Sequence, residues 1–369
     1  MTPAPSLFVT LHSHLQPGGG GVQWCSREYH QTLVAAGLQP YVVTFEIDRS
    51  LRARFLRRFR PRPYTHRIPG GLGLEITAQA QQHGARWCFL NNTDALALAP
   101  ILHARMPSLH LVFLSHGAEI TDVVNNLRLA PETAGREQTT PCWLGRLLQS
   151  EIAIRASLTG SVVISEPDLL IEKWLGSPAA VFLPRSIPRD PLLATGLPGR
   201  VGCVATLDHG PNLHGLRLFA EALGRHSGVR LRLVGGPVDY GRCLASQHPI
   251  IDYLGPLDDA QLRAEAATWR AFVNPVFCPA RGASTKVSTA LGWGLPVLTT
   301  PDGARGYTWP SGTLPLSESP TALAALACEL AEATNPAPSR AAAERLVHAA
   351  PTPAQTAAAL TTFLEQIRH

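Results

Sequence analysis

The sequence predicts an α/β fold built as two doubly wound parallel-sheet domains. At 369 residues the chain is longer than one hydrophobic core ordinarily serves, which favours two domains. Short apolar or β-branched segments alternate with helix-like segments along the chain, a pattern typical of parallel strands joined by crossover helices. Hydrophobic residues make up 45% of the chain and charged residues 16%, which excludes a disordered, collagen-like or coiled-coil protein.

The N-terminal half contains five predicted strands, each a short apolar or β-branched run. They cover residues 7–13, 41–45, 87–91, 109–115 and 161–165. Helices are expected between them, where apolar residues recur at helical spacing, at residues 22–36, 94–104, 144–156 and 167–174.

The C-terminal half repeats this alternation. Strands are expected at residues 201–205, 230–234, 250–254, 271–274 and 296–299, and helices at residues 212–225, 259–267 and 285–293. After Gly312 the chain becomes alanine-rich with helical spacing, which predicts terminal helices without further chemistry.

Prolines and glycines mark the boundary between the two halves. Between residues 184 and 200 both periodicities are interrupted by Pro184, Pro188, Pro191, Gly196, Pro198 and Gly199. We therefore expect an N-terminal domain over residues 1–184, a C-terminal domain over residues 185–349 and a terminal helix over residues 350–369.

Cysteine usage and hydropathy bear on the compartment. The seven cysteines are scattered and never form a CxxC pair, so we expect no disulfide framework, no metal site and a reducing, cytoplasmic location. No run approaches the ~18 consecutive apolar residues of a membrane helix. Residues 1–6 lack the charged and apolar regions of a signal peptide. We expect neither a membrane span nor export.

The positive charge of the chain is local. Of the net charge of +5, eight positive charges come from arginines between residues 49 and 67, so the rest of the chain is at −3. This speaks against a nucleic-acid partner and for one basic patch. Arg54, Arg57, Arg58 and Arg60 surround an apolar stripe at helical spacing, a pattern typical of a helix drawn to an anionic membrane surface. A solvated face over a core-packed stripe is the alternative, because Pro61 and Pro63 cut the helix short.

A glycine loop follows the first predicted strand. Gly18, Gly19, Gly20 and Gly21 precede a helix expected from Val22. Such a loop lets the backbone approach a ligand and aims helix N–H groups at an anion, although a flexible turn is the alternative. The loop is not a P-loop, because no GK[ST] follows, and it matches GxGxxG in part because Gln23 fills the last place.

A histidine follows the strand at residues 109–115. His116 stands where an open α/β sheet places ligands, at the carboxyl end of a strand, and can hydrogen-bond a sugar hydroxyl or stabilise charge near neutral pH. Glu119 and Asp122 come within two turns after it. They are candidates for contact with an acceptor in the cleft, with helix capping as the alternative.

The most informative stretch is residues 271–300. A predicted strand, a loop of small residues carrying Arg281 and Lys286, a helix and a second strand form one βαβ unit. The small residues expose backbone N–H groups and two cations to one place, which suits a diphosphate. The chain has two lysines, Lys173 and Lys286, and finding one of them in this loop favours a binding role over a solvated helix start.

Residues 274–300, with residues 302–306 after them, resemble the C-terminal signature of GT-B glycosyltransferases of the glycosyltransferase family 4 (group 1) type. Residues 201–212 are similar to the opening strand and Pro-Asn turn of that family's donor domain. Shorter likenesses occur in the family's order at the glycine loop, the His116-Gly117 step, Ser165-Glu166 and residues 231–236 and 253–255.

The resemblance implies a GT-B architecture, in which two Rossmann-like domains face each other across a cleft. The C-terminal domain would bind a nucleotide-diphosphate sugar and the N-terminal domain would present the acceptor. Gly18 to Gly21 would approach the donor phosphates and His116, the catalytic candidate, would touch the transferred sugar. The donor would be held by Arg281, Gly282, Ser284, Thr285 and Lys286.

The sequence also departs from the family. The usual pair of glutamates seven residues apart falls on Gly282 and Thr289, and the Arg and Lys that often follow the first donor-domain strand are missing from residues 203–214. No DxD motif occurs, so we expect no metal-bridged diphosphate.

We therefore expect a retaining, metal-independent glycosyltransferase with no cofactor besides its nucleotide-sugar substrate. Its acceptor would be a glycan or lipid-linked molecule of bacterial surface polysaccharide or glycolipid assembly, with the arginine patch as a peripheral contact to the inner membrane. Two alternatives stay open. A catalytically degenerate homologue acting as a binding or partner subunit would explain the missing glutamates. A nucleotide-sugar epimerase of the same fold would need an acid and a base, for which His116, Glu119 and Asp122 are candidates.

Overall fold

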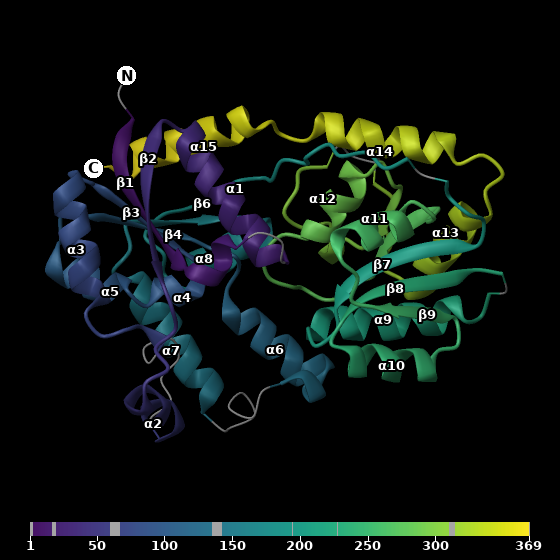
Figure 1. Cartoon of the computed structure of the whole chain (residues 1–369), viewed down its shortest axis with the longest axis horizontal. Helices are drawn as coiled ribbons and strands as arrows, with labels where there is room; N and C mark the ends of the chain where they lie inside the picture. The colour runs from purple at the N-terminus through teal and green to yellow at the C-terminus, as the bar shows by residue number, and fades with distance from the viewer. Residues whose placement is uncertain are drawn as a thin grey trace.

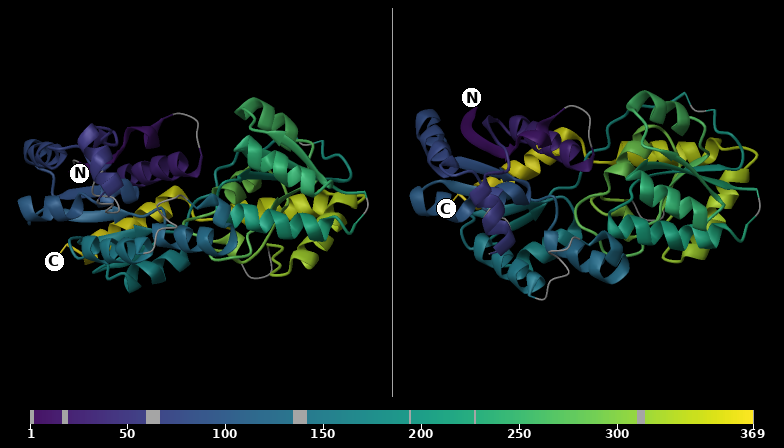
Figure 2. Two further views of the ribbon diagram at one scale, coloured as in Figure 1. Left: turned by 90° about the horizontal axis from the view of Figure 1, so that it is seen from below. Right: turned by 60° about the horizontal axis from the view of Figure 1, so that its bottom comes forward.

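A computed structural model describes residues 3–16, 20–59, 67–134, 142–193, 195–226, 228–309 and 314–368 of the chain. Two parallel sheets, each covered by helices, lie side by side as separate domains (Figures 1 and 2). This arrangement confirms the predicted fold class. No helix in these ranges has the length and hydropathy that a membrane crossing requires.

The N-terminal sheet has six parallel strands in the order β2-β1-β3-β4-β5-β6. The strands are β1 (Ala4–Leu11), β2 (Leu38–Phe45), β3 (Trp87–Asn91), β4 (His110–Leu114), β5 (Gly160–Val163) and β6 (Ala180–Phe182). Leu7 and Val9 pack into one core cluster while Phe8 packs into another. Strand β1 is therefore buried on both faces, which is why it is mostly apolar.

The helices of this domain are α1 (Gly21–Ala35), α2 (Leu51–Phe59), α3 (Leu72–His83), α4 (Asn92–Leu96), α5 (Ala99–Arg105), α6 (Glu119–Leu129), α7 (Trp143–Arg155) and α8 (Glu166–Trp174), with short 3-10 turns η1 (His12–Leu15) and η3 (Pro131–Thr133). The single helix predicted over residues 94–104 is wrong in one respect, because α4 and α5 are separate. Pro100 lacks the N–H that a continuous helix would need at that position, so the chain turns and restarts at Ala99. Helices α3 and α6 and strand β6 were not among the predicted elements.

The C-terminal sheet has five parallel strands in the order β11-β10-β7-β8-β9. They are β7 (Arg200–Thr206), β8 (Arg230–Gly236), β9 (Ile251–Gly255), β10 (Ala271–Asn274) and β11 (Val297–Thr299). The helices are α9 (Gly210–Leu223), α10 (Val238–Gln247), α11 (Asp259–Ala266), α12 (Thr285–Gly292), α13 (Pro320–Glu332) and α14 (Ala337–Ala349), with the 3-10 turn η4 (Asp302–Ala304). Helix α10 was also not among the predicted elements.

Each sheet has a point where the strand order reverses, between β1 and β3 in the first and between β7 and β10 in the second. Open α/β sheets bind ligands beyond the carboxyl ends of their strands at such points. The loops that follow β7 and β10, and those that follow β1, β3 and β4, are therefore the places to look for a site.

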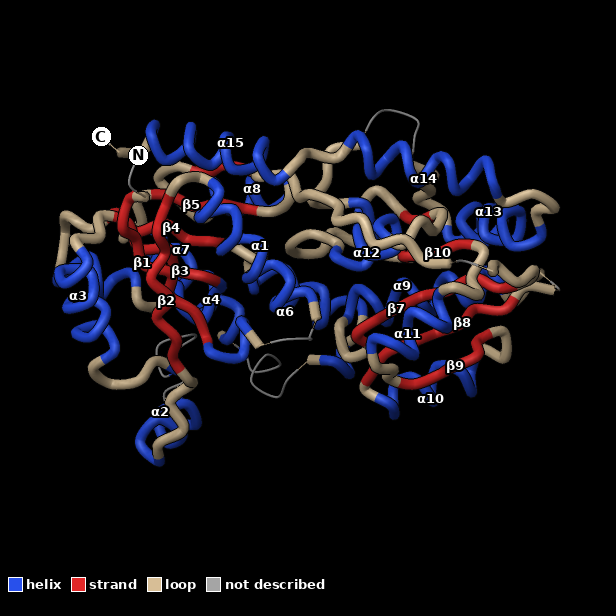
Figure 3. The backbone as a smooth tube through the Cα atoms, turned by 45° about the horizontal axis from the view of Figure 1, so that its top comes forward, coloured by secondary structure: helices blue, strands red, loops and turns tan. Residues whose placement is uncertain are grey.

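The last helix, α15 (Pro353–Gln366), returns to the N-terminal domain (Figures 1 and 3). Leu360, Phe363 and Leu364 are buried in the same cluster as Phe8 and Leu33. The chain thus crosses between the domains twice, once before β7 and once before α15.

Candidate functional site

The two domains meet through the loops that follow their strands. Helix α1 contacts α12 and helix α6 contacts α9, each pair with one helix from each domain. The interface therefore brings the first-turn residues of α1 and α6 next to the loops that follow β7 and β10 in the C-terminal domain.

The closest approach joins the His116-Gly117 step after β4 to the Arg281-Gly282 step after β10. Gly117 has φ +100°, and a Cβ there would stand 2.4 Å from Arg281 Cβ. Gly282 has φ +66°, and a Cβ there would stand 2.6 Å from the carbonyl oxygen of His116. Both positions require glycine, because the positive φ and the short distance to the facing loop each disfavour a side chain. Position 282, where the family places a glutamate, has no room for a side chain here.

Arg281 faces the N-terminal domain. Its Nε lies 2.6 Å from Asp122 Oδ2 on α6, and Asp122 Oδ1 is 3.2 Å from His209 Nε2 at the start of α9. Burial opposes ionisation of Asp122, but Arg281 and His209 outweigh it and lower the pKa of this carboxyl. Asp122 is therefore a charged bridge between the domains, and Glu119 lies one turn before it in α6.

Lys286 lies in the first turn of α12, where it joins the two loops at the C-terminal switch point. Its Nζ donates a hydrogen bond of 2.9 Å to Asn212 Oδ1, and Asn212 in turn donates to the carbonyl of Thr206 at the end of β7. Burial is the main cause that lowers the pKa of the amine to about 8; Cys203 opposes the shift and Arg305 adds to it. A partly dehydrated ammonium beside a helix N-terminus is suited to receive phosphate oxygens.

The glycine loop faces this helix. A Cβ on Gly21, the first residue of α1, would lie 3.1 Å from Thr285 Oγ1, the first residue of α12. Gly20 is the N-cap of α1. The N-terminal turns of two helices from different domains are thus neighbours. Gly18 and Gly19 lie outside the described residues.

Two of the predicted donor-binding residues, Gly282 and Ser284, fix the loop between β10 and α12. Their polar groups bind other parts of the protein. The Gly282 amide donates to Asp168 Oδ2 at 2.8 Å. Ser284 is buried, its Oγ accepts from Asn274 Nδ2 at 3.2 Å and its amide donates to the carbonyl of Arg305. The loop is therefore fixed by contacts within its own domain and with the N-terminal domain before any ligand arrives.

His116 is 7% exposed and lies between β4 and α6. Its Nε2 is 2.9 Å from Asn91 Oδ1, its ring centroid is 5.7 Å from that of Tyr29, and its Nδ1 has no hydrogen-bond partner among the described residues. Burial, followed by the nearby His14, Arg281 and Arg185, holds the pKa of the imidazole well below its usual value. The ring is neutral at pH 7.

Sequence reasoning did not single out Asp168, Arg305, Asn91 or Asn212. Asp168 follows Ser165 by three residues, a spacing that indicates an N-cap at Ser165. Ser165 does cap α8, and this local role gives no sign of the contact with the other domain. Arg305, in the loop after β11, donates to the carbonyls of Arg281 and Asp302. Its charge is also near enough to Lys286 to lower the pKa of that amine. It lies within the stretch that carries the family resemblance, which was the available signal.

No cluster of His, Cys, Asp and Glu suited to a metal occurs in the described ranges.

Helix α2 lies apart from this site and projects from the N-terminal domain (Figure 1). Leu51 and Phe55 are 83% and 61% exposed, Arg54 is exposed, and Ala53 faces inward. The apolar stripe is therefore not packed on the core at these two positions. The side chains of Arg57 and Arg58, and residue Arg60 altogether, lie outside the described part of the chain.

Residues 198–333 match the family model described as glycosyl transferases group 1. A search among curated proteins finds no significant match. Among solved structures, the chain is similar to Anabaena Alr3699/HepE in complex with UDP and glucose, with a TM-score of 0.61, 15% identity and coverage of 98% of this chain and 100% of that one.

Two more structures are similar over almost their full lengths. The lipopolysaccharide outer core galactosyltransferase WaaB matches with a TM-score of 0.59, 11% identity and coverage of 98% and 99% of the two chains. A glycosyltransferase from Rickettsia africae matches with a TM-score of 0.58, 12% identity and coverage of 99% of each chain. The structure has the GT-B fold of these proteins, and the C-terminal domain carries the group 1 signature. Together these findings support a glycosyltransferase.

Proposed function

We propose that the chain transfers a sugar from a nucleotide-diphosphate donor, held by the C-terminal domain, to an acceptor held by the N-terminal domain. The observation that carries the proposal is the position of Lys286. Its partly buried ammonium sits in the first turn of α12 within electrostatic range of Arg305, and the preceding residue, Thr285, faces Gly21 of the other domain. A diphosphate placed there would meet cations, helix N–H groups and glycine backbone from both domains.

The chemistry proposed for this site is metal-independent and retaining. Loss of the nucleoside diphosphate leaves negative charge on its oxygens, and Lys286, Arg305 and the α12 N-terminus would stabilise that charge in a site shielded from water. Neither Gly282 nor Thr289 supplies a carboxylate, and the Thr289 hydroxyl donates back to the Thr285 carbonyl. The site would thus work through leaving-group stabilisation, with His116 holding the transferred sugar.

We place the acceptor among glycan or lipid-linked molecules of bacterial surface polysaccharide or glycolipid assembly. WaaB, one of the similar structures, is a galactosyltransferase of the lipopolysaccharide outer core. The exposed Leu51 and Phe55 next to Arg54 support a peripheral contact of the N-terminal domain with anionic lipid, where a lipid-linked acceptor would be found.

A thermal-shift screen over nucleoside diphosphates and nucleotide sugars tests donor binding, because a ligand that binds the native state raises stability by mass action. The ligand that gives the largest shift is then incubated with acceptor glycans and the products are separated. Glycosyl transfer is the expected outcome. Binding without turnover would instead identify a degenerate binding subunit, and conversion of the donor sugar without acceptor would identify an epimerase.

A further inference from the structure

A chain of hydrogen bonds leads from α1 to His116 and fixes the hydrogen positions along it. The Ser26 hydroxyl donates to the Val22 carbonyl in α1 at 2.8 Å. A hydroxyl has one hydrogen, so Ser26 Oγ must act as the acceptor in its other contact, the 2.9 Å contact with Asn91. The atom of Asn91 that faces Ser26 is therefore the amide nitrogen, Nδ2.

The orientation of Asn91 determines the tautomer of His116. With Nδ2 directed at Ser26 Oγ and Thr10 Oγ1, both at 2.9 Å, the carbonyl Oδ1 faces His116 Nε2 at 2.9 Å. An amide oxygen can only accept, so Nε2 carries the hydrogen. A neutral imidazole has one N–H, and Nδ1 of His116 is consequently a bare acceptor.

This acceptor is buried and lacks a partner among the described residues. The charged and titratable groups facing the ring come from four places: His14 after β1, Tyr29 on α1, Arg185 after β6 and Arg281 of the C-terminal domain. The first, third and fourth of these disfavour a second proton on His116, as does burial. A buried acceptor with no protein donor calls for an explanation, and a hydrogen donated by a bound ligand supplies one.

We propose that Asn91, held by Ser26, is a positioning residue that fixes His116 as a neutral acceptor, with Nδ1 ready to receive the sugar hydroxyl that the proposed function already assigns to His116. That the hydroxyl belongs to a sugar rests on the proposed function, whereas the tautomer of His116 does not. The arrangement also sets specificity, because a lone pair in a buried place accepts a hydroxyl and repels a carboxylate at the same position of the sugar.

The variant that tests this role is Asn91→Asp. A carboxylate in place of the amide still accepts the Nε2 hydrogen, but it favours the imidazolium and so places a hydrogen on Nδ1 at low pH. Asn335→Asp is the matched control, since Asn335 is exposed and its side-chain oxygen accepts the Ala337 amide, a task that an aspartate performs equally well. Long-range ¹H–¹⁵N spectra of histidine-labelled protein report the tautomer, with His116→Gln to assign the signal.

In the native protein the spectra should show the Nε2–H tautomer from pH 6 to 8, and in Asn91→Asp a doubly protonated His116 at pH 6. Turnover of Asn91→Asp should fall about tenfold or more at pH 6 and recover toward pH 8, a pH profile that a purely structural defect would not give. A native Nδ1–H tautomer, or an Asn91→Asp protein with the native pH profile, would overturn the proposal.

The ligand contact is probed with UDP-glucose. At saturation the Nδ1 signal should move with UDP-glucose and stay in place with UDP, and the same shift from both would overturn the hydroxyl contact. Failure of every nucleotide sugar to bind would instead overturn the proposed function, while the tautomer measured without ligand would still decide the role of Asn91.

Discussion

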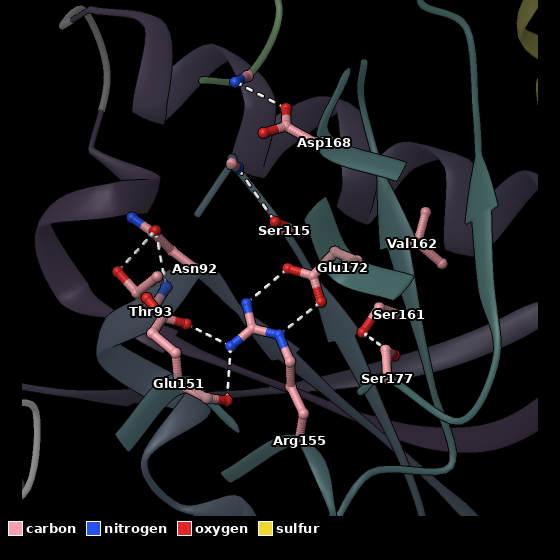
Figure 4. Close-up of polar contacts among 12 residues, drawn as sticks. Asn92, Thr93, Ser115, Glu151, Arg155, Ser161, Val162, Asp168, Glu172 and Ser177 are labelled. Atoms are coloured by element: carbon pink, nitrogen blue, oxygen red, sulfur yellow. Dashed lines mark hydrogen bonds and ion pairs between the residues drawn. The ribbon is translucent and has the colours of Figure 1, made fainter. Parts of the chain in front are cut away.

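Asp168 of the N-terminal domain accepts a hydrogen bond from the Gly282 amide of the C-terminal domain at 2.8 Å (Figure 4). The same carboxyl oxygen accepts from the Ser165 hydroxyl, and the other oxygen is buried without a partner among the described residues. A single carboxyl group thus contacts the Ser165 cap of α8 and holds the loop after β10 of the other domain against the His116 carbonyl. The position of this loop depends on domain contact as well as on its own sequence.

The Asp168 carboxyl predicts a pH dependence of stability. Burial raises its pKa and outweighs the opposing contacts with Ser165, the Gly282 amide and Arg305. Because the folded-state pKa is raised, the favourable contribution is complete below the unfolded pKa and is lost as the pH rises through the folded pKa. The difference in unfolding free energy, wild type minus Asp168→Asn, should therefore be more positive at pH 4 than at pH 7. Urea titrations at both pH values measure it, and an equal difference at both would contradict the shift.

Arg155 predicts a large loss of stability. Its guanidinium is fully buried, forms hydrogen bonds of 2.8 and 2.6 Å to the two carboxyl oxygens of Glu172, and also contacts Glu151 (Figure 4). Arg155→Met should lower the unfolding free energy by about 3–5 kcal/mol, because it leaves two buried carboxylates without their counter-ion. Arg225→Met is the matched control, since Arg225 also pairs with a glutamate four residues earlier but is 67% exposed. There the loss should stay below ~1 kcal/mol, and similar losses in the two variants would refute the argument.

Lys286 predicts weaker donor binding. Lys286→Ala should reduce the affinity for nucleoside diphosphate by about 1–3 kcal/mol, the loss expected of a charge-assisted contact. The other lysine of the chain, Lys173, is exposed on α8, and Lys173→Ala should leave the affinity unchanged. Calorimetric titration measures both, and equal affinities of the two variants would remove the phosphate role of Lys286.

The same amine predicts how binding depends on pH. Its pKa of about 8 means that the ammonium is the main form at pH 7 and is lost as the pH rises through 8. Nucleoside diphosphate affinity should therefore decline from pH 7 to pH 9 in the wild type and stay flat in Lys286→Ala. A parallel decline in both proteins would assign the titration to another group.

His116 predicts a separation of turnover from affinity. His116→Ala should reduce turnover by about 100-fold while nucleotide affinity stays within about twofold, because under the proposed function the imidazole contacts the sugar and not the nucleotide. His103→Ala, on the exposed face of α5, serves as the control. Should nucleotide affinity fall as much as turnover, the side chain belongs to the nucleotide site or to the fold.

Helix α2 predicts attachment to anionic lipid. Headgroup contacts contribute about 1 kcal/mol per basic residue near a leaflet, so three or four arginines suffice for reversible, salt-sensitive binding. Changing Arg54, Arg57, Arg58 and Arg60 to Ser should abolish co-sedimentation with anionic vesicles. The control carries the same change of charge at four exposed arginines elsewhere, Arg225, Arg242, Arg345 and Arg368. If the two variants sediment alike, the patch is a solvated face or meets a soluble acceptor.

The sequence predicts the sheets better than the site. Strand β10 was predicted to the residue because Ala271–Asn274 is an uninterrupted buried run, and Pro100 explains why one predicted helix is two. Local composition also pointed to Lys286. It could not point to Asp168 or Asn91, because their partners, Gly282 and His116, are 114 and 25 residues away in the chain and neither contact leaves a periodic signal.

The return of α15 to the N-terminal domain decides how the protein can be dissected. Leu360, Phe363 and Leu364 cover Phe8 and Leu33, so a fragment ending at the linker would expose that apolar face to water. Expression of the first domain by itself would need residues 353–366 supplied in trans or fused at its amino terminus by circular permutation. A stop codon within residues 353–366 would likewise damage the domain that is synthesised first.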